Sequence, residues 1–404
     1  MQQKKLIRVT TVPLSIDKLL TGQLRFLGSF FDVMAVSSDL EYLKRCAERE
    51  GVRFAAIDMT RGITPLKDFV ALVRFVFLFY KERPFIVHSQ TPKAGLLAML
   101  AAKVMGVPVR LHTVGGLPLM EATGMKRKLL IAIEQLTYRC AHRVYVNSHG
   151  LSAYMVSEGL IRPEKLEVLG NGSTNGVDTR FFSRENILPS HTAQLREQLG
   201  IDPDDFVVVF VGRIVKDKGI VELVDAFLKV AAKYEHAKLL LVGMEEPETD
   251  PLPSLTLGKI ADNRAIISVG FKDDVRPYLA MGNVLVLPSY REGFPNVVLQ
   301  AGSMELPVIA TNINGCNEII VDGVSGLLVP VKNTLAIQHA ILRLLNEPEL
   351  SQQMGRSARE RIEAFYGQAY LWKQIAHQYA LFEQKVTNPG VEPQGADAIG
   401  AHAK

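Results

Sequence analysis

The chain has little of what crosslinks small proteins or anchors proteins in membranes. Its 404 residues include only three cysteines, Cys46, Cys140 and Cys316, an odd number at wide spacing. Neither a disulfide framework nor a zinc site is therefore predicted, and a reducing compartment is indicated. The longest apolar run, 69–80, is interrupted by Arg74 and is too short to span a bilayer, so it predicts a buried or interfacial helix. Two lysines lead directly into a strand-like run, without a secretory signal.

Two further absences narrow the possible functions. No G-x-G-x-x-G follows the first predicted strand, which disfavours an NAD-dependent dehydrogenase. No group of histidine, cysteine and carboxylate residues has the spacing of a metal site, so we expect no bound metal and no other cofactor. An apolar content of 48% with 22% charged residues is typical of a soluble globular protein. We expect no nucleic-acid partner.

The charge is unevenly distributed along the chain. Residues 1–180 carry 25 lysines and arginines against 15 acidic residues, a net charge of +10, whereas the other 224 residues carry 21 against 27, a net charge of −6. The basic half is expected to face something anionic, such as phospholipid headgroups or a lipid pyrophosphate. Solvated helix faces would explain this excess equally well. The Lys-Arg-Lys segment 126–128 fits peripheral attachment to an anionic leaflet, so we expect a cytoplasmic protein at the inner face of the plasma membrane.

Short runs rich in valine, isoleucine and leucine alternate with helical segments along the whole chain. Most of these runs are continuous, as expected of parallel strands that are covered on both faces. Repeated strand-helix units predict an α/β fold, and the strands suffice for two doubly wound sheets. The predicted strands are 7–13, 31–37, 53–58, 85–89, 107–113, 143–147, 166–170, 206–212, 238–243, 265–270, 284–288, 307–311 and 327–330.

The boundary between the two predicted domains lies in a turn-rich, polar stretch at about 175–200. We place an N-terminal domain at 1–180 and a C-terminal domain at 181–367. A final helical segment at about 368–385 contains the only tryptophan. Residues 386–404 are rich in proline, glycine and alanine and are predicted to be disordered.

The second domain opens with F-V-V-V-F-V-G-R-I-V-K-D-K-G-I. A strand there leads to Gly212 and Arg213, and Lys218 and Gly219 precede a helix that begins near Ile220. Two cations at a strand-to-helix turn suit a pyrophosphate, because arginine offers a planar fork and lysine a point charge. A surface turn with solvated charges is the alternative.

A second motif, S-Y-R-E-G-F-P-N-V-V-L-Q, follows the strand at 284–287. It presents Glu292 in a turn, where Gly293 lets the backbone approach a ligand and Pro295 suits the first position of a new helix. A carboxylate beside a helix N-terminus can hold a sugar hydroxyl and a phosphate together. If helical periodicity extends from Glu292 to Gln300, the position eight residues later returns near the face of Glu292. The amide of Gln300 cannot act as a base.

Polar candidates also follow strands of the first half. His112 ends a predicted strand and is followed by a turn at Gly115 and Gly116, while His88 and Lys93 flank a neighbouring strand end. Ligands of parallel sheets gather beyond the carboxyl ends of strands, although a lone histidine is commonly structural. In the first turn, Ser15 and Lys18 are candidates for contact with an acceptor phosphate.

Taken in order, V-T-T-V-P-L-S, H-T-V-G-G-L-P-L-M, G-R-I-V-K-D-K-G, R-E-G-F-P-N-V-V-L-Q-A-G and N-G-C-N-E-I-I-V-D-G resemble bacterial family-four glycosyltransferases of capsule, O-antigen or glycan assembly. This resemblance spans nearly the whole chain. It implies the GT-B fold, two Rossmann-like domains that face a central cleft, with the final helix crossing back to pack on the first domain. Some relatives transfer N-acetylgalactosamine to an undecaprenyl-diphosphate-linked sugar. The chain departs from the family at Gln300, where a glutamate is usual, and at the first turn, which has Pro13 in place of a glycine pair.

The resemblance also implies roles for individual residues. Arg213 and Lys218 would bind the donor diphosphate and stabilise the departing nucleotide, Glu292 would bind hydroxyls of the donor sugar, and His112 would lie near that sugar. Gln300 would bind the ribose. The remaining donor-site candidates are Gly212, Gly270, Phe271 and Val275, which precede or bracket the base, and Gly293, Phe294, Pro295 and Asn296, which form the turn beside sugar and phosphate.

The implied reaction transfers a hexose or N-acetylhexosamine from a UDP-sugar to a lipid-linked saccharide, with retention at the anomeric carbon and closure of two domains over the donor. Two alternatives remain open. A UDP-sugar 2-epimerase shares the two-domain plan but needs acid-base carboxylates in the cleft and no lipid acceptor. A non-catalytic sensor would bind the sugar nucleotide without turnover.

Overall fold

The computed structural model describes residues 3–60, 62–120, 122–246, 248 and 250–388, and these form two compact units. Unit 1 comprises the residues up to Asn147, Leu151–Asn175 and the segment from Ala369 onward. Unit 2 comprises Ser148–Gly150 and Gly176–Gln368. The main division thus falls at residue 175, five residues before the predicted one.

Unit 1 is built on a seven-stranded parallel sheet with the strand order β3-β2-β1-β4-β5-β6-β7. The order reverses between β1 and β4, as in other doubly wound sheets. Every strand lies within a few residues of a predicted one. The strands are β1 (Lys5–Val9), β2 (Asp32–Ser37), β3 (Arg53–Ala56), β4 (Ile86–Gln90), β5 (Val109–Val114), β6 (Arg143–Val146) and β7 (Leu166–Val168).

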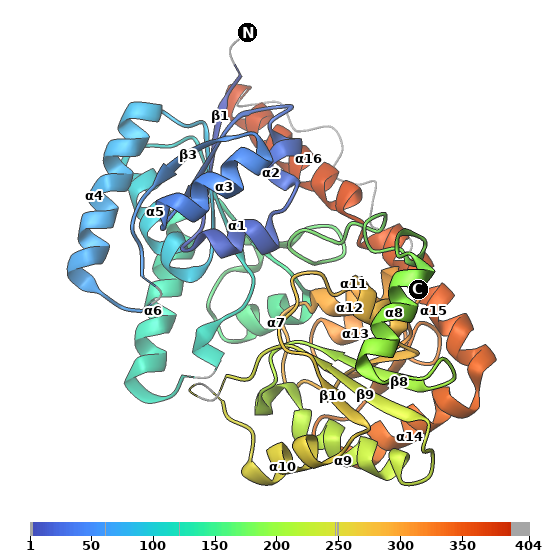
Figure 1. The fold of residues 1–404 in the computed structure, drawn as a ribbon. Coiled ribbons are helices and arrows are strands. Elements are labelled where there is room, and N and C mark those ends of the chain that lie inside the picture. Colours follow the sequence, from blue (N-terminus) through green and yellow to red (C-terminus); the bar gives the residue numbers. More distant parts are fainter. Residues whose placement is uncertain (1–2, 61, 121, 247, 249, 389–404) are drawn as a thin grey trace. The chain divides into compact units, whose positions relative to one another are not determined.

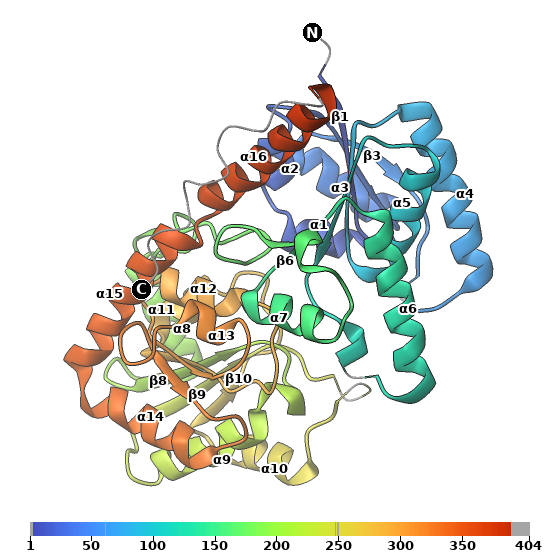
Figure 2. The same cartoon turned by 180° about the vertical axis from the view of Figure 1, so that it is seen from behind.

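Helices cover both faces of this sheet (Figures 1 and 2). Alternate strand residues point to opposite faces: Ile7 and Val9 pack in one buried cluster with α4, α5 and α6, while Leu6 packs in another with α1, α2, α3 and α16. The helices and 3₁₀ turns are α1 (Pro13–Leu19), α2 (Gln23–Leu27), α3 (Leu40–Glu50), α4 (Pro65–Glu82), α5 (Pro92–Val104), η1 (Pro118–Met120), α6 (Gly124–Cys140), α7 (His149–Ser157), η2 (Pro163–Lys165) and α16 (Gln368–Thr387).

The last helix, α16, completes the core of unit 1. Leu371, Ile375 and Tyr379 are buried against the sheet, and the Tyr379 hydroxyl accepts a hydrogen bond from Arg8 Nη1 of β1 at 2.9 Å. Figures 1 and 2 both show α16 alongside α2. Trp372 Nε1 donates to Asn175 Oδ1 at 2.7 Å, so the single tryptophan also belongs to this unit. The helix continues to Thr387, two residues into the predicted tail 386–404, of which 389–404 lie outside the described residues.

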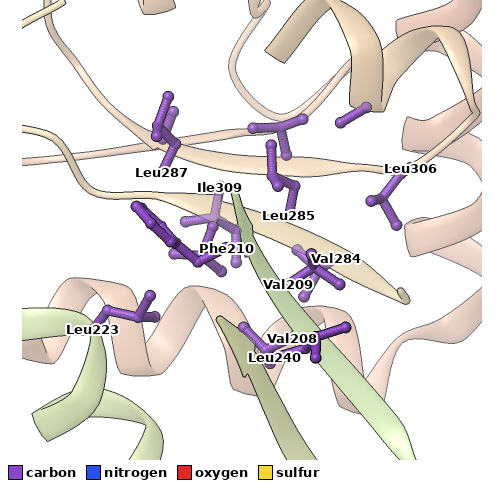
Figure 3. Packing of buried hydrophobic residues seen from close by; sticks show 14 of the residues in the cluster. Val208, Val209, Phe210, Leu223, Leu240, Val284, Leu285, Leu287, Leu306 and Ile309 are labelled. Carbon is purple, nitrogen blue, oxygen red and sulfur yellow. The ribbon is translucent and has the colours of Figure 1, made fainter. Parts of the chain in front are cut away.

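Unit 2 has a six-stranded parallel sheet with the order β10-β9-β8-β11-β12-β13, so the prediction of two doubly wound sheets is confirmed. Its strands are continuous apolar runs because both faces are buried: Figure 3 shows Phe210, Leu223 and Ile309 from different elements in one cluster. The strands are β8 (Phe206–Val211), β9 (Ala237–Val242), β10 (Ile266–Ser268), β11 (Val284–Leu287), β12 (Val308–Thr311) and β13 (Leu327–Val329).

The helices of unit 2 alternate with these strands. They are η3 (Arg184–Asn186), α8 (Pro189–Leu199), η4 (Lys216–Lys218), α9 (Ile220–Ala231), α10 (Ser254–Asp262), α11 (Arg276–Met281), α12 (Asn296–Ser303), α13 (Cys316–Ile319), α14 (Thr334–Asn346) and α15 (Pro348–Phe365). Within the described parts of both units, no helix is long and apolar enough to cross a membrane.

Candidate functional site

The strand order of unit 2 reverses between β8 and β11, so the loops after these two strands leave the sheet as neighbours. Open α/β sheets bind ligands beyond the carboxyl ends of their strands at such a reversal. The loop after β8 carries Arg213 and Lys218, and the loop after β11 carries Glu292. The two strongest sequence motifs of the second domain therefore meet at one place in the fold.

Gly219 brings the two loops into contact. It has φ 71° in the left-handed region, and a Cβ atom at this position would lie 2.1 Å from the carbonyl oxygen of Pro288, which follows β11. Only a residue without a side chain allows this approach. Helix α9 then begins at Ile220, as predicted.

Lys218 and Glu292 form an ion pair at the centre of the site. Lys218 Nζ lies 2.5 Å from Glu292 Oε1, and Ser289 Oγ donates to the same carboxylate oxygen at 2.7 Å. The lysine and glutamate side chains are 16% and 13% exposed, so both can still reach solvent or a ligand. Asn314 Nδ2 donates to the Gly293 carbonyl at 3.1 Å and so holds the loop.

Arg213 is the second cation of the site and is half exposed. Its Nη1 donates to Glu246 Oε2 at 2.8 Å, and Nη2 lies 3.8 Å from Asp217. Asp217 is also 3.2 Å from Arg291, so one carboxylate sits between two guanidinium groups. Both predicted phosphate-binding cations therefore already have carboxylate partners.

The turn after Glu292 differs in detail from the prediction. Helix α12 begins at Asn296, with Pro295 at its N-cap, one residue later than expected. Glu292 lies in the loop outside this helix, so helical periodicity does not relate Gln300 to its face. Gln300 is a partly buried residue of α12, and its proposed contact with ribose stays a prediction.

The other predicted donor-site residues lie at the same edge of the sheet. Gly212 directly follows β8, and Gly270 (φ 69°) and the 57% exposed Phe271 come after β10. Val275 is the N-cap of α11 and is partly buried against the core, as is Phe294, whose ring centroid lies 5.6 Å from that of Tyr366. Phe271 has the exposure that stacking on a base requires.

The expectation that His112 contacts the donor sugar does not fit its position in unit 1. The side chain is 1% exposed, its Nδ1 lies 2.9 Å from Ser89 Oγ, and a Cβ at Gly95 would come within 2.4 Å of the ring. Burial lowers the pKa of His112 to about 4. This histidine points into the core, where it positions its strand, and does not present a free edge to a ligand.

His88 is likewise buried, which corrects its assignment to the acceptor side. Its Nδ1 lies 2.5 Å from Arg8 Nη1 and 2.6 Å from the Tyr379 hydroxyl, and its Nε2 lies 2.7 Å from Thr113 Oγ1. Burial, and then the charge of Arg8, lowers the pKa of His88 well below its usual value. The neutral ring joins β1, β4 and β5 to α16.

Lys93 is also engaged within the fold, because its Nζ lies 2.6 and 2.8 Å from the two carboxylate oxygens of Asp68. Ser15 and Lys18 lie on α1, where Lys18 is half exposed and 3.6 Å from Asp17. Gly115 and Gly116 are exposed after β5. The acceptor roles of these last four residues stay predictions.

Four residues of the site were not predicted from the sequence: Ser289, Asp217, Glu246 and Asn314. Three of these lie inside or beside the quoted motifs, and their polar side chains at strand ends were the available signal. Glu246 could not have been found, because it pairs with Arg213 from 33 positions away. Among the residues that the structure describes, no three His, Cys, Asp or Glu side chains are grouped to hold a metal ion.

Comparisons with known proteins agree with this arrangement. Residues 191–361 match the family model "Glycosyl transferases group 1", and residues 24–172 match "Glycosyl transferase 4-like domain". The chain is 35% identical over 384 residues to the capsular polysaccharide biosynthesis glycosyltransferase CapM of Staphylococcus aureus, covering 95% of this chain and 98% of CapM. The chain is a glycosyltransferase of group 1.

More distant relatives agree with this family. A UDP-Gal:alpha-D-GlcNAc-diphosphoundecaprenol alpha-1,3-galactosyltransferase of Escherichia coli is 28% identical, with 75% of this chain and 77% of that protein covered. The crystal structure of Anabaena Alr3699/HepE in complex with UDP and glucose has a TM-score of 0.79 at 18% identity, covering 93% of this chain and 99% of that one. This structural similarity confirms the GT-B fold of the glycosyltransferase.

Proposed function

We propose that this glycosyltransferase transfers a hexose or N-acetylhexosamine from a UDP-sugar to a lipid-linked saccharide, with retention, in the synthesis of a surface polysaccharide. The proposal rests on the contacts that Lys218 and Ser289 make with Glu292 at the point where the strand order of the unit 2 sheet reverses. Arg213 lies in the same loop as Lys218, after β8. The name of the E. coli relative supports the donor and acceptor classes, and that of the S. aureus relative supports the synthesis of a surface polysaccharide.

In this mechanism the anomeric carbon loses its bond to the β-phosphate oxygen while the acceptor hydroxyl bonds to the same face. The hydroxyl proton passes to an oxygen of the departing phosphate, so no protein nucleophile is needed. Lys218 and Arg213 exchange their carboxylate partners for the diphosphate and stabilise its growing charge, the largest contribution that such sites make. Glu292, released from Lys218, accepts hydrogen bonds from the sugar hydroxyls.

A panel of UDP-sugars incubated with the enzyme and a membrane extract tests this proposal. Mass analysis of the lipid fraction is expected to show one added sugar with one donor. A parallel incubation with the UDP-sugar alone is expected to return it unchanged. An epimerised sugar nucleotide there would replace the transferase assignment by a 2-epimerase, and binding without turnover under every condition would indicate a sensor.

Transfer is expected to continue at an unchanged rate in excess EDTA, because two protein cations supply the charge that a metal ion supplies elsewhere. The measurement is product formation before and after dialysis against EDTA, with Mg²⁺ added back in a third sample. A rate that falls in EDTA and returns with Mg²⁺ would contradict this prediction.

We also propose that α4 attaches the enzyme to an anionic membrane. The helix has two apolar stripes: Ala71, Phe75 and Phe79 are buried, while a second stripe faces solvent. The exposed stripe consists of Leu66 (86% exposed), Phe69 (66%), Val70 (50%), Val73 (37%), Phe77 (69%) and Tyr80 (64%). Exposed Lys67, Arg74 and Lys81 on the same helix, and Lys126 and Lys128 at the start of α6, match anionic headgroups.

Vesicle sedimentation tests this attachment. Replacing Phe69 and Phe77 with serine is expected to weaken binding to phosphatidylglycerol vesicles by roughly tenfold or more, since each buried aromatic side chain contributes about 1.5–3 kcal/mol. The control is L255S in unit 2, where an equally exposed leucine (73%) is removed. Equal sedimentation of all three proteins, or sedimentation that does not require the anionic lipid, would disprove the membrane role.

A further inference from the structure

We infer that unit 1 contains a second binding site, for a phosphate group joined to an apolar group, in the pocket between the ends of α6 and α7 and the 3₁₀ turn η2. This inference does not depend on the proposed function. It rests on the pocket, on the cations that line it and on its place in the fold.

The pocket has a volume of about 570 Å³ and is lined by ten residues, none of them acidic. Three are cations: Arg139 in the last turn of α6, Arg162, and Lys165 at the end of η2. Within the described residues none of the three forms an ion pair. Three acidic residues lie beside the lining: Glu158 pairs with Arg127, Glu134 is buried next to Tyr138, and Glu164 is exposed in η2. The lining itself therefore carries three cations and no acidic residue.

Lys165 is held in place by the backbone. Its Nζ donates to the carbonyl oxygens of Tyr138 at 3.1 Å and Ala141 at 2.8 Å, at the C-terminal end of α6. An ammonium group has three donors, so one remains for a ligand. Burial, and then the charges of Arg110, Lys103 and Arg162, lower the pKa of Lys165, which shows that cations crowd this region. A bound anion would relieve that repulsion.

One part of the remaining wall of the pocket is apolar. Val156 is 37% exposed, Leu160 is 3% exposed and Ile161 is partly buried, and all three line the same pocket as the cations. A bare inorganic anion would leave this wall in contact with water. A phosphate that carries an alkyl or aryl group would cover it, so the pocket fits a phosphate monoester better than free phosphate.

The position of the pocket separates it from any catalytic centre of unit 1. Arg139 precedes β6 and Lys165 directly precedes β7, so the pocket lies at the amino-terminal edge of the parallel sheet. Catalytic and substrate-binding loops of such sheets lie at the opposite, carboxyl edge. The ligand is therefore an additional one, either a lipid headgroup or a soluble phosphate ester.

Titration calorimetry with monohexyl phosphate and with inorganic phosphate tests the site. The wild-type protein is expected to bind monohexyl phosphate more tightly, and the R139Q/R162Q variant to lose roughly tenfold or more for both, because charged hydrogen bonds are lost. V156S is expected to lose only the preference for the hexyl group. The matched control is K229Q/K233Q, which removes the same charge from exposed positions of unit 2. Arg139 and Arg162 are exposed, so folding is expected to be preserved.

Vesicles of phosphatidylcholine with and without phosphatidic acid distinguish the source of the phosphate. Binding to phosphatidic acid that R139Q/R162Q weakens and K229Q/K233Q does not would identify a lipid headgroup. Binding of monohexyl phosphate alone, with the same dependence, would identify a soluble ester. Equal affinities of wild type and R139Q/R162Q for every probe, or an equal loss in K229Q/K233Q, would overturn the inference.

Discussion

Replacing Lys218 with glutamine is expected to lower kcat by roughly 100-fold to 1,000-fold, the loss that follows removal of one charge-stabilising donor from an active site. Lys218 lies at the point where β8 and β11 bring two loops together, and it is the cation that contacts Glu292 directly. The leaving diphosphate carries more charge in the transition state than in the bound donor. A neutral amide at this position therefore costs more in kcat than in the affinity for the donor.

K216Q is the matched control for this experiment. Lys216 is an exposed lysine of the same turn, η4, so its removal changes the local charge equally without touching the ion pair. The charge-reversed pair R213E/K218E is expected to abolish transfer and to lower the thermal midpoint of unfolding below that of K218Q, because each new carboxylate faces the acidic partner of the cation it replaces. A native rate in R213E/K218E, or an equal loss in K216Q, would remove the diphosphate role from these residues.

Acidification from pH 6.5 to pH 4 is expected to destabilise unit 1, by about 3 kcal/mol from His112 alone. Burial lowers the pKa of His112 to about 4, against 6.5 in the unfolded chain. Between these values the unfolded chain binds a proton that the folded chain excludes, so the stability present above pH 6.5 is lost as the pH falls toward 4. His88 and His142, whose pKa values burial also lowers, add to the same trend.

Denaturant titrations at pH 7.5 and pH 5, followed by fluorescence, measure this effect. Trp372 is the only tryptophan and belongs to unit 1, so its emission reports on the unit that contains the buried histidines. H112F is expected to show a smaller difference between the two pH values than the wild type, whatever its stability at either pH. H339Q removes an exposed histidine of unit 2 as the control. An unchanged difference in H112F would show that His112 is not the titrating group.

The fold could be predicted from the sequence because its strands are buried on both faces. Runs such as 206–211 are apolar throughout, and a strand of this kind is recognised from length and composition without knowledge of its neighbours. The order of the strands could not be predicted in the same way. Adjacency of β8 and β11 depends on how the whole unit closes, and this adjacency brings Lys218 to Glu292, 74 positions away.

The candidate site was therefore predicted as separate motifs and not as a constellation. Arg213, Lys218 and Glu292 were recognised from the loops in which they lie, whereas the partners Glu246 and Ser289 were not. For the histidines of unit 1, the strands were predicted correctly but the direction of the side chains was not. His88 and His112 stand on strands whose two faces are both buried, so no alternation of polar and apolar residues indicates whether a side chain points to the strand end or into the core.

The position of α16 has a consequence for synthesis of the protein. Arg8 and Tyr379 are in contact although 371 positions separate them, and Leu371 and Ile375 fill the same cluster as Leu6. A nascent chain can thus not finish the first Rossmann-like unit until its last helix has left the ribosome. The second unit is nearly continuous in sequence and is complete earlier. Translation runs from unit 1 to unit 2, but folding is completed in the reverse order.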